Sequence, residues 1–176
     1  MNPASDAAVA GQYIGIRNGI DIDANGRYVG YSQLVDLPNR MQLMVAAEAW
    51  FLKAEAALNG WAGAGDVQTN YETGITTSFD MYGLTAQAAG YIANNTNTEQ
   101  QYIDPKAITP GQNDVVTGSP YLSTITIAWN NGDTPERKLE RIITQKWLAI
   151  FPDGQEAWSE FRRTKYPKLF PVVLNK

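Results

Sequence analysis

The chain has neither cysteine nor histidine among its 176 residues. Their absence excludes disulfides, thiolate nucleophiles, Ser-His and Cys-His catalytic triads, and zinc or haem sites that rely on thiolate or imidazole ligands. The sequence also lacks a run of 18 apolar residues that could cross a membrane, and it shows no secretory signal peptide. The reactive groups that remain are carboxylates, tyrosine, lysine, serine and threonine, and no cofactor or metal is predicted.

Basic residues are also in short supply. The chain carries 14 Lys and Arg against 18 Asp and Glu, which gives a formal net charge of −4. Its basic residues are dispersed or paired with acids, whereas binding to nucleic acid requires a clustered basic surface. The sequence therefore predicts no nucleic-acid partner. With 44% hydrophobic residues, the chain has the composition of a globular protein that can bury a core.

The N-terminal part of the chain has no helical period. Residues 1–40 are rich in glycine and asparagine and predict an irregular, turn-rich segment of short extended pieces. Asn25-Gly26 is a strong signal for a tight turn because both residues tolerate positive φ. The segment closes at Leu37-Pro38, since the residue before a proline is driven out of the helical region.

Two helical patterns follow. In Met41–Leu58 and in Asp66–Met81, apolar residues recur every three or four positions, which is typical of amphipathic helices. Asn59-Gly60 is a typical helix stop, and the short loop predicts an antiparallel hairpin. The hairpin is similar to a tetratricopeptide unit, and further such units would lie outside this chain.

The remainder is predicted to be one helical domain, residues 41–176, that contains a long surface loop. Capping oxygens, a proline in the first turn and stop signals delimit its elements. The fold class is therefore mainly α, with a loop-rich segment and minor short strands. The further elements are a helix at Thr85–Ala93, the loop at 94–119, a short strand or extended segment at Tyr121–Trp129, a helix that begins at Asp133-Thr134-Pro135-Glu136, and a last helix at Asp153–Arg163.

Three stretches resemble a known family. They are residues 46–61, Tyr71–Ile75 with Ser78-Phe79, and Glu140–Tyr166, where two helical patterns meet at Phe151-Pro152. Together they resemble the SusD/RagB family, the outer-membrane lipoproteins that capture glycans. The resemblance implies tetratricopeptide-like helix pairs and no catalytic activity. It also implies binding of oligosaccharide or polysaccharide on the extracellular face of the outer membrane, for delivery to a SusC-like TonB-dependent transporter.

The resemblance does not cover a whole member of that family. Its lipid-anchored N-terminus and early helix pairs have no counterpart here, so we expect the chain to be the C-terminal portion of a longer protein. Any attachment to the membrane would be made through a lipid anchor that is absent from this chain. Two other functions stay open: a helical-repeat adaptor that binds protein segments, and a glycosidase built on a pair of carboxylates.

Aromatic side chains are the best candidates for contacts with sugar, because a pyranose ring stacks its apolar face on them. Trp50, Trp147 and Trp158 fall on the apolar faces of predicted helices and are expected in the core. Other aromatic residues lie in or beside loops that are rich in asparagine, and these are the predicted ligand-binding residues. They are Trp61, Tyr91, Tyr102, Tyr121 and Trp129.

Two further motifs have a structural and a functional interpretation. Asp21-x-Asp23-x-Asn25-Gly26 matches the first half of a calcium loop, but Ser32 stands where the loop requires a bidentate glutamate, so a hairpin turn is the preferred interpretation. Arg162-Arg163 could bind phosphate or carboxylate through its planar guanidinium groups. We favour a structural role, in which a buried arginine clamps loop carbonyls and a helix acid.

Overall fold

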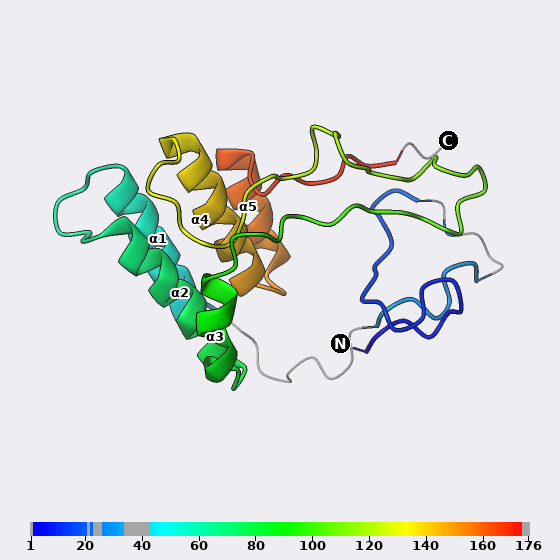
Figure 1. Ribbon diagram of the computed structural model, residues 1–176, viewed down its shortest axis with the longest axis horizontal. Coiled ribbons are helices and arrows are strands. Elements are labelled where there is room, and N and C mark those ends of the chain that lie inside the picture. Colours follow the sequence, from blue (N-terminus) through cyan, green and yellow to red (C-terminus); the bar gives the residue numbers. More distant parts are fainter. Residues whose placement is uncertain (1, 21, 23–25, 34–42, 174–176) are drawn as a thin grey trace. The chain divides into compact units, whose positions relative to one another are not determined.

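The computed structural model describes residues 2–20, 22, 26–33 and 43–173 (Figure 1). The described residues group into two compact units, one drawn from Gln42–Glu99 and Ser123–Lys168 and the other from Met1–Met41, Gln100–Leu122 and Leu169–Lys176. We call the first the helical unit and the second the loop-rich unit. The two domains predicted from the sequence, 1–40 and 41–176, stay a prediction.

The fold is mainly α, as predicted. Among the described residues there are five helices, and the only β pairings are the isolated bridges Asn2–Gln33 and Tyr102–Val115. Figure 1 shows α1 and α2 side by side as a hairpin, with α4 against α1. The helices are α1 (Ala46–Leu58), α2 (Val67–Met81), α3 (Thr85–Ile92), α4 (Pro135–Ala149) and α5 (Gly154–Thr164).

Polar caps set the starts of three helices where the sequence places them. The Asp66 carboxylate accepts a hydrogen bond from the Thr69 amide at 2.7 Å, which begins α2. The Thr134 hydroxyl caps α4 ahead of Pro135, and the Asp153 carboxylate caps α5. Each cap satisfies amide groups that a first helical turn leaves without partners.

The first helix begins later than predicted. Val45 is extended, with φ −101° and ψ 143°, and α1 begins at Ala46. Leu43 and Met44 continue the apolar period but are 83% and 58% exposed. Val45 at the N-cap position makes no side-chain cap hydrogen bond, and this β-branched residue has a lower helix propensity than the alanines that follow. Residue 41 lies outside the described residues.

The core of the helical unit lies where α1, α2 and α4 meet. Phe51 is 1% exposed and its ring packs edge-on against Tyr71, with 6.2 Å between ring centroids. Ile75 and Ile142 belong to the same core. The Tyr71 hydroxyl donates to the Ile127 carbonyl at 2.7 Å, so that the segment before α4 is attached to the hairpin. Residues 121–129 form no strand and run as an irregular segment.

The tryptophans do not follow the prediction of a core role. Trp50 and Trp147 are only half-buried. Trp158 is 57% exposed and stacks on Phe161 of the same helix at 5.7 Å, so its predicted place in the core is wrong. Ala157 and Glu160 take the inward face of α5: Ala157 packs against the hydrophobic core, and Glu160 pairs with Lys146 of α4.

A buried carboxylate organises the loop-rich unit. Asp104 is 4% exposed and accepts hydrogen bonds from the Tyr28 hydroxyl at 2.7 Å and the Asn113 side-chain amide at 2.6 Å. These bonds join segments that are far apart in the sequence, in a unit whose described residues form no helix. The calcium candidates Asp21, Asp23 and Asn25 lie outside the described residues, as does Leu37-Pro38.

Candidate functional site

Two of the predicted ligand-binding aromatics pack against the core of the helical unit. The Tyr91 ring lies 5.0 Å from that of Phe79, and the Tyr91 hydroxyl donates to the Gln145 side chain at 3.1 Å. The Trp129 ring lies 5.2 Å from that of Tyr71, and its indole N–H donates to Asn131 at 2.9 Å. Both residues are half-buried, and their main contacts are structural.

The other three predicted aromatics are divided between the two units. Trp61 lies in the α1–α2 loop of the helical unit and is 70% exposed. Tyr121 and Tyr102 belong to the loop-rich unit. Tyr121 is 46% exposed, whereas Tyr102 is half-buried and its hydroxyl accepts a hydrogen bond from the Arg17 amide at 3.2 Å. Trp61 and Tyr121 therefore have the accessible rings on which a sugar could stack.

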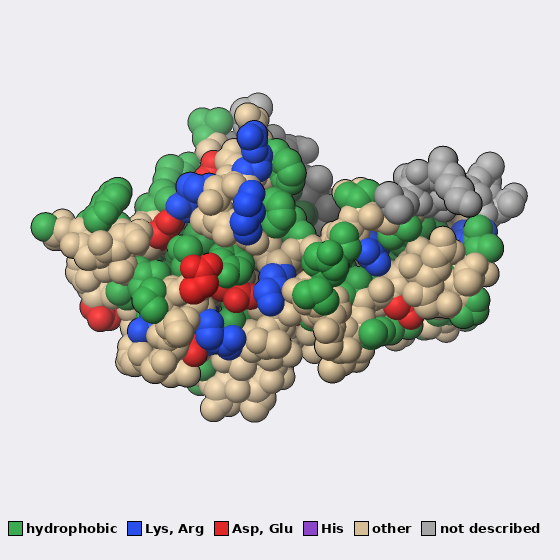
Figure 2. Space-filling view, turned by 90° about the horizontal axis from the view of Figure 1, so that it is seen from above, with side chains coloured by type: hydrophobic (Ala, Val, Ile, Leu, Met, Phe, Trp, Pro, Cys, Tyr) green, Lys and Arg blue, Asp and Glu red, His purple; other side chains and the backbone are tan. Residues whose placement is uncertain are grey.

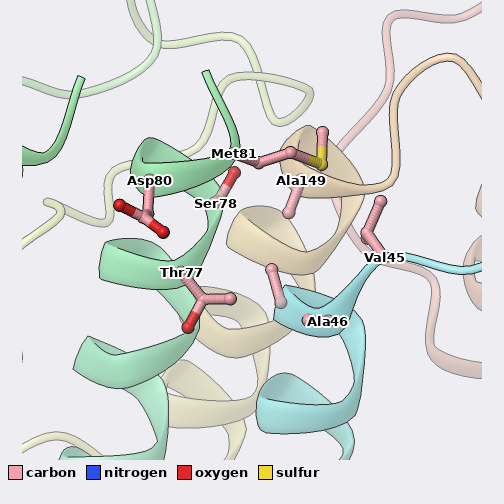
Figure 3. A pocket seen from close by; sticks show the side chains of 8 residues that line it. Val45, Ala46, Thr77, Ser78, Asp80, Met81 and Ala149 are labelled. Carbon is pink, nitrogen blue, oxygen red and sulfur yellow. The ribbon is translucent and has the colours of Figure 1, made fainter. Parts of the chain in front are cut away.

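A hollow that the sequence did not indicate opens between the ends of three helices (Figure 3). Its cavity volume is about 180 Å³. None of the predicted aromatics lines it, and small side chains make it possible, since alanine leaves room where helices meet. The lining residues are Val45, Ala46 and Ala47 at the start of α1, Thr77, Ser78, Asp80 and Met81 at the end of α2, and Ala149 at the end of α4.

In the helical unit, a largely buried ion cluster surrounds Lys146. The Lys146 side chain is 1% exposed, and its ammonium nitrogen lies 2.8 Å from Glu160, 2.9 Å from Glu156 and 3.4 Å from Glu48. An ammonium group has three hydrogens to donate, so these three carboxylates saturate it. The cluster joins α1, α4 and α5.

The carboxylates of this cluster respond differently to burial. Burial raises the pKa of Glu48 in spite of the nearby Lys146. Burial also acts to raise the pKa of Glu160, but hydrogen bonds from Lys146 and Arg163 outweigh it and hold the pKa below its ordinary value. Glu160 is therefore stabilised as an anion, whereas ionisation of Glu48 is opposed.

This difference predicts opposite results for two matched substitutions. Glu160→Gln is expected to lower the free energy of unfolding of the full-length protein by about 2–3 kcal/mol at pH 7, because charged hydrogen bonds are lost. Glu48→Gln is expected to be neutral or stabilising, because it removes a poorly solvated charge. Chemical denaturation measures both.

The same pair has a defined pH dependence. A lowered pKa stabilises the fold above the ordinary value of 4.5, and this contribution is lost as pH falls through the folded-state pKa. The cost of Glu160→Gln should therefore shrink as the pH is lowered below about 5. An equal cost for the two variants at pH 7, or a cost of Glu160→Gln that is constant down to pH 3, would contradict this account.

The paired arginines have unequal roles. Arg163 makes a bidentate contact with Glu55 of α1 and also contacts Glu160 at 2.6 Å, so it links α5 to α1. Its side chain is 48% exposed, and Arg162 is exposed. The predicted buried clamp on a loop carbonyl is made instead by Arg141. The Arg141 side chain is 2% exposed and donates to the Thr126 carbonyl at 2.9 Å and to Asp133 at 2.6 Å.

The charged side chains form no broad field of one sign on the face shown in Figure 2, where acidic and basic groups lie interspersed over the helices. Within the described ranges, no group of three or more acidic, histidine or cysteine side chains could hold a metal ion. None of the helices seen in the described part of the chain is long and apolar enough to cross a membrane.

Comparison with solved structures gives strong matches. A chitin-binding SusD homolog from Flavobacterium johnsoniae is 45% identical, with a TM-score of 0.86 over 99% of this chain and 34% of its own. A SusD-like protein from Bacteroides thetaiotaomicron is 39% identical, with a TM-score of 0.84 over 97% of this chain and 35% of its own. A SusD homolog from Bacteroides vulgatus is 35% identical, with a TM-score of 0.84 over 99% and 35%.

The chain thus spans about a third of the length of these relatives. No curated protein sequence matches it significantly. The family model described as "Susd and RagB outer membrane lipoprotein" matches residues 1–176. The resemblance drawn from the three sequence stretches is confirmed: the chain belongs to the SusD-like family of outer membrane lipoproteins.

Proposed function

We propose that the protein captures oligosaccharide on the extracellular face of the outer membrane and delivers it, uncleaved, to a SusC-like TonB-dependent transporter. The observation that carries this proposal is the match, over nearly the whole chain, to a homolog that binds chitin. Chitin is a polymer of N-acetylglucosamine, so oligomers of this sugar are the first ligands to test. Membership of an outer-membrane lipoprotein family supports the location.

The described surface supports recognition by stacking. Trp61 and Tyr121 expose large aromatic faces outside the two cores, and a pyranose can lay its apolar face on either. Sugar hydroxyls exchange water for protein partners with little net gain, so moderate affinity is expected. The buried carboxylates support binding without cleavage, because Glu48, Glu140 and Glu160 already hold protein donors.

A second candidate function, a helical-repeat adaptor for protein segments, is favoured by one observation. The α1–α2 pair is an antiparallel hairpin with a short loop, as in tetratricopeptide units. An adaptor function predicts tight binding of a peptide and no binding of glycans.

Calorimetry on the full-length protein tests the proposal. Titration with N-acetylglucosamine oligomers should show binding and release no reducing sugar. Trp61→Ala is expected to weaken binding about tenfold, or ~1.4 kcal/mol, if its ring stacks on the ligand. Trp158→Ala is the matched control, since it removes an exposed ring from α5 and should leave affinity unchanged.

Three results would count against the proposal. Binding of a peptide in the absence of any glycan binding would favour the adaptor. Release of reducing sugar by the purified protein would favour a glycosidase. Retention of affinity by both Trp61→Ala and Tyr121→Ala would contradict recognition of the sugar by stacking on these two exposed rings.

A further inference from the structure

The connection between α1 and α2, residues 59–66, holds Trp61 in a defined backbone conformation, and we call it the Trp61 loop (Figure 1). The Trp61 amide donates to the Ala56 carbonyl at 3.0 Å. The Gly60 amide donates to the Ala57 carbonyl at 3.0 Å, and Gly60 has the left-handed φ of +74° that completes this type of helix end. The Trp61 carbonyl accepts a hydrogen bond from the Ala64 amide at 3.2 Å. The backbone of Trp61 is therefore held on both sides.

A buried asparagine fastens the far side of the Trp61 loop to the hairpin. Asn70 lies in the first turn of α2 and is 3% exposed. Its side-chain amide nitrogen donates to the Ala64 carbonyl at 2.8 Å and reaches the Lys53 carbonyl of α1 at 3.5 Å. A side-chain amide has two hydrogens to donate, so this one residue of α2 joins the loop to α1.

Asparagine is an unfavourable residue for a buried position in a helix. It has a lower helix propensity than alanine, and burial of its amide costs free energy unless hydrogen bonds replace those made to water. The carbonyls that satisfy the Asn70 amide lie outside α2, and the closer one belongs to the Trp61 loop. Asn70 therefore stabilises the conformation of the loop rather than the helix that contains it.

The side chain that this loop presents is an accessible aromatic ring. Trp61 is 70% exposed although its backbone is held on both sides. A contact residue that is ordered before the ligand arrives loses less entropy on binding. We propose that Asn70 is a positioning residue for glycan capture: its side-chain amide fixes the loop that holds the Trp61 ring where a pyranose stacks on it. This inference rests on the proposed function, in which Trp61 is a sugar contact.

A double-mutant cycle in the full-length protein tests the coupling of the two residues. Calorimetry with N-acetylglucosamine oligomers should show binding weakened about threefold to tenfold by Asn70→Ala, and by no more than Trp61→Ala, because Asn70 acts through that ring. In the Trp61→Ala background, Asn70→Ala should change the affinity by less than about twofold. Unchanged affinity in Asn70→Ala alone, or a full further loss in the Trp61→Ala background, overturns the proposal.

Fluorine NMR of the full-length protein labelled with 5-fluorotryptophan reports on the ring without any glycan. The resonance that is missing from the spectrum of Trp61→Phe belongs to Trp61. Asn70→Ala should broaden this resonance or move it toward its position in the unfolded protein. Gly74→Ala crowds the Phe51 ring in the core instead, so it should lower stability and leave both the resonance and the glycan affinity unchanged. A Trp61 resonance that Asn70→Ala does not change contradicts a positioning role.

Gly63→Ala is a second variant that spares the core, for the case in which Asn70→Ala does not fold. Gly63 lies inside the turn closed by Trp61 and Ala64 and has a φ of +80°. A Cβ atom at this position would meet nothing within 4 Å, so the substitution strains only the loop backbone. It should displace the Trp61 resonance and weaken glycan binding. Wild-type affinity in Gly63→Ala overturns the proposal.

The titration of the wild-type protein distinguishes failure of this inference from failure of the proposed function. Wild-type protein that binds the oligomers, with equal affinity in Asn70→Ala and Gly63→Ala, overturns the positioning role and leaves glycan capture intact. Wild-type protein that binds no glycan overturns glycan capture, and the positioning role with it.

Discussion

Lys146→Ala is expected to lower the free energy of unfolding of the full-length protein by about 3–5 kcal/mol. The substitution removes the only cation within contact of Glu48 and Glu156 in the described contacts, and one of two beside Glu160. Glu48 and Glu160 are 9% and 6% exposed, so water cannot replace the lost partner. An unpaired buried carboxylate is more costly than the net value of the pair itself.

Matched variants separate this cause from a general loss of charge. Arg163→Ala removes a side chain that is 48% exposed, and solvent screening should limit its cost to about 1 kcal/mol. Arg162→Ala, at an exposed position, should cost little. The double variant Lys146→Met/Glu160→Gln should cost less than its two single variants combined, because it removes charge of both signs. Additive effects of the two substitutions, or a small loss of stability in Lys146→Ala, would contradict the claim that the ion cluster stabilises the packing of α1, α4 and α5.

Gly74→Ala is expected to destabilise the protein by about 1–3 kcal/mol, although alanine is the better helix former. A Cβ atom at position 74 would lie 2.8 Å from Cε1 and Cζ of the Phe51 ring. That ring is 1% exposed and wedged against Tyr71, so it cannot move away without disturbing the core. Overpacking at this crossing of α1 and α2 therefore outweighs the gain in helix propensity.

Gly90→Ala provides the control, because it makes the same substitution inside α3 where a Cβ would meet nothing within 4 Å. It should stabilise the protein by about 0.5–1 kcal/mol. Thermal unfolding of both variants and the wild type compares them directly. If the two glycine variants shift the melting temperature in the same direction, close packing at Gly74 is not the deciding factor.

The helices themselves were predictable because their signals are local. Asp66, Thr134 and Asp153 cap helices within three residues of their own positions, and Pro135 sits where its missing amide hydrogen costs nothing. The start of α1 was predicted too early, because the apolar period runs on through Leu43 and Met44 although the helix begins at Ala46 without a side-chain cap. Periodicity alone does not say where a helix begins.

The contents of the helix interfaces were not predictable in the same way. Arg141 and Lys146 have the residue type of a solvated helix face but are 2% and 1% exposed. Trp158 has the residue type of a core and is exposed. In each case the burial of the side chain depends on the residues of a neighbouring helix. Carboxylates of α1 and α5 pair with Lys146, and on the inward side of α5 it is Glu160, not Trp158, that contacts α4.

The amino-acid sequence by itself determined the mainly helical fold, the positions of the helix caps and the family, because caps, periods and motifs are properties of neighbouring residues. Only the tertiary structure decided which charges are buried together, which aromatic faces stay accessible and where the helix ends leave a hollow. Burial and pairing depend on side chains that are close in space and distant in sequence, and the order of residues does not specify those distances one by one.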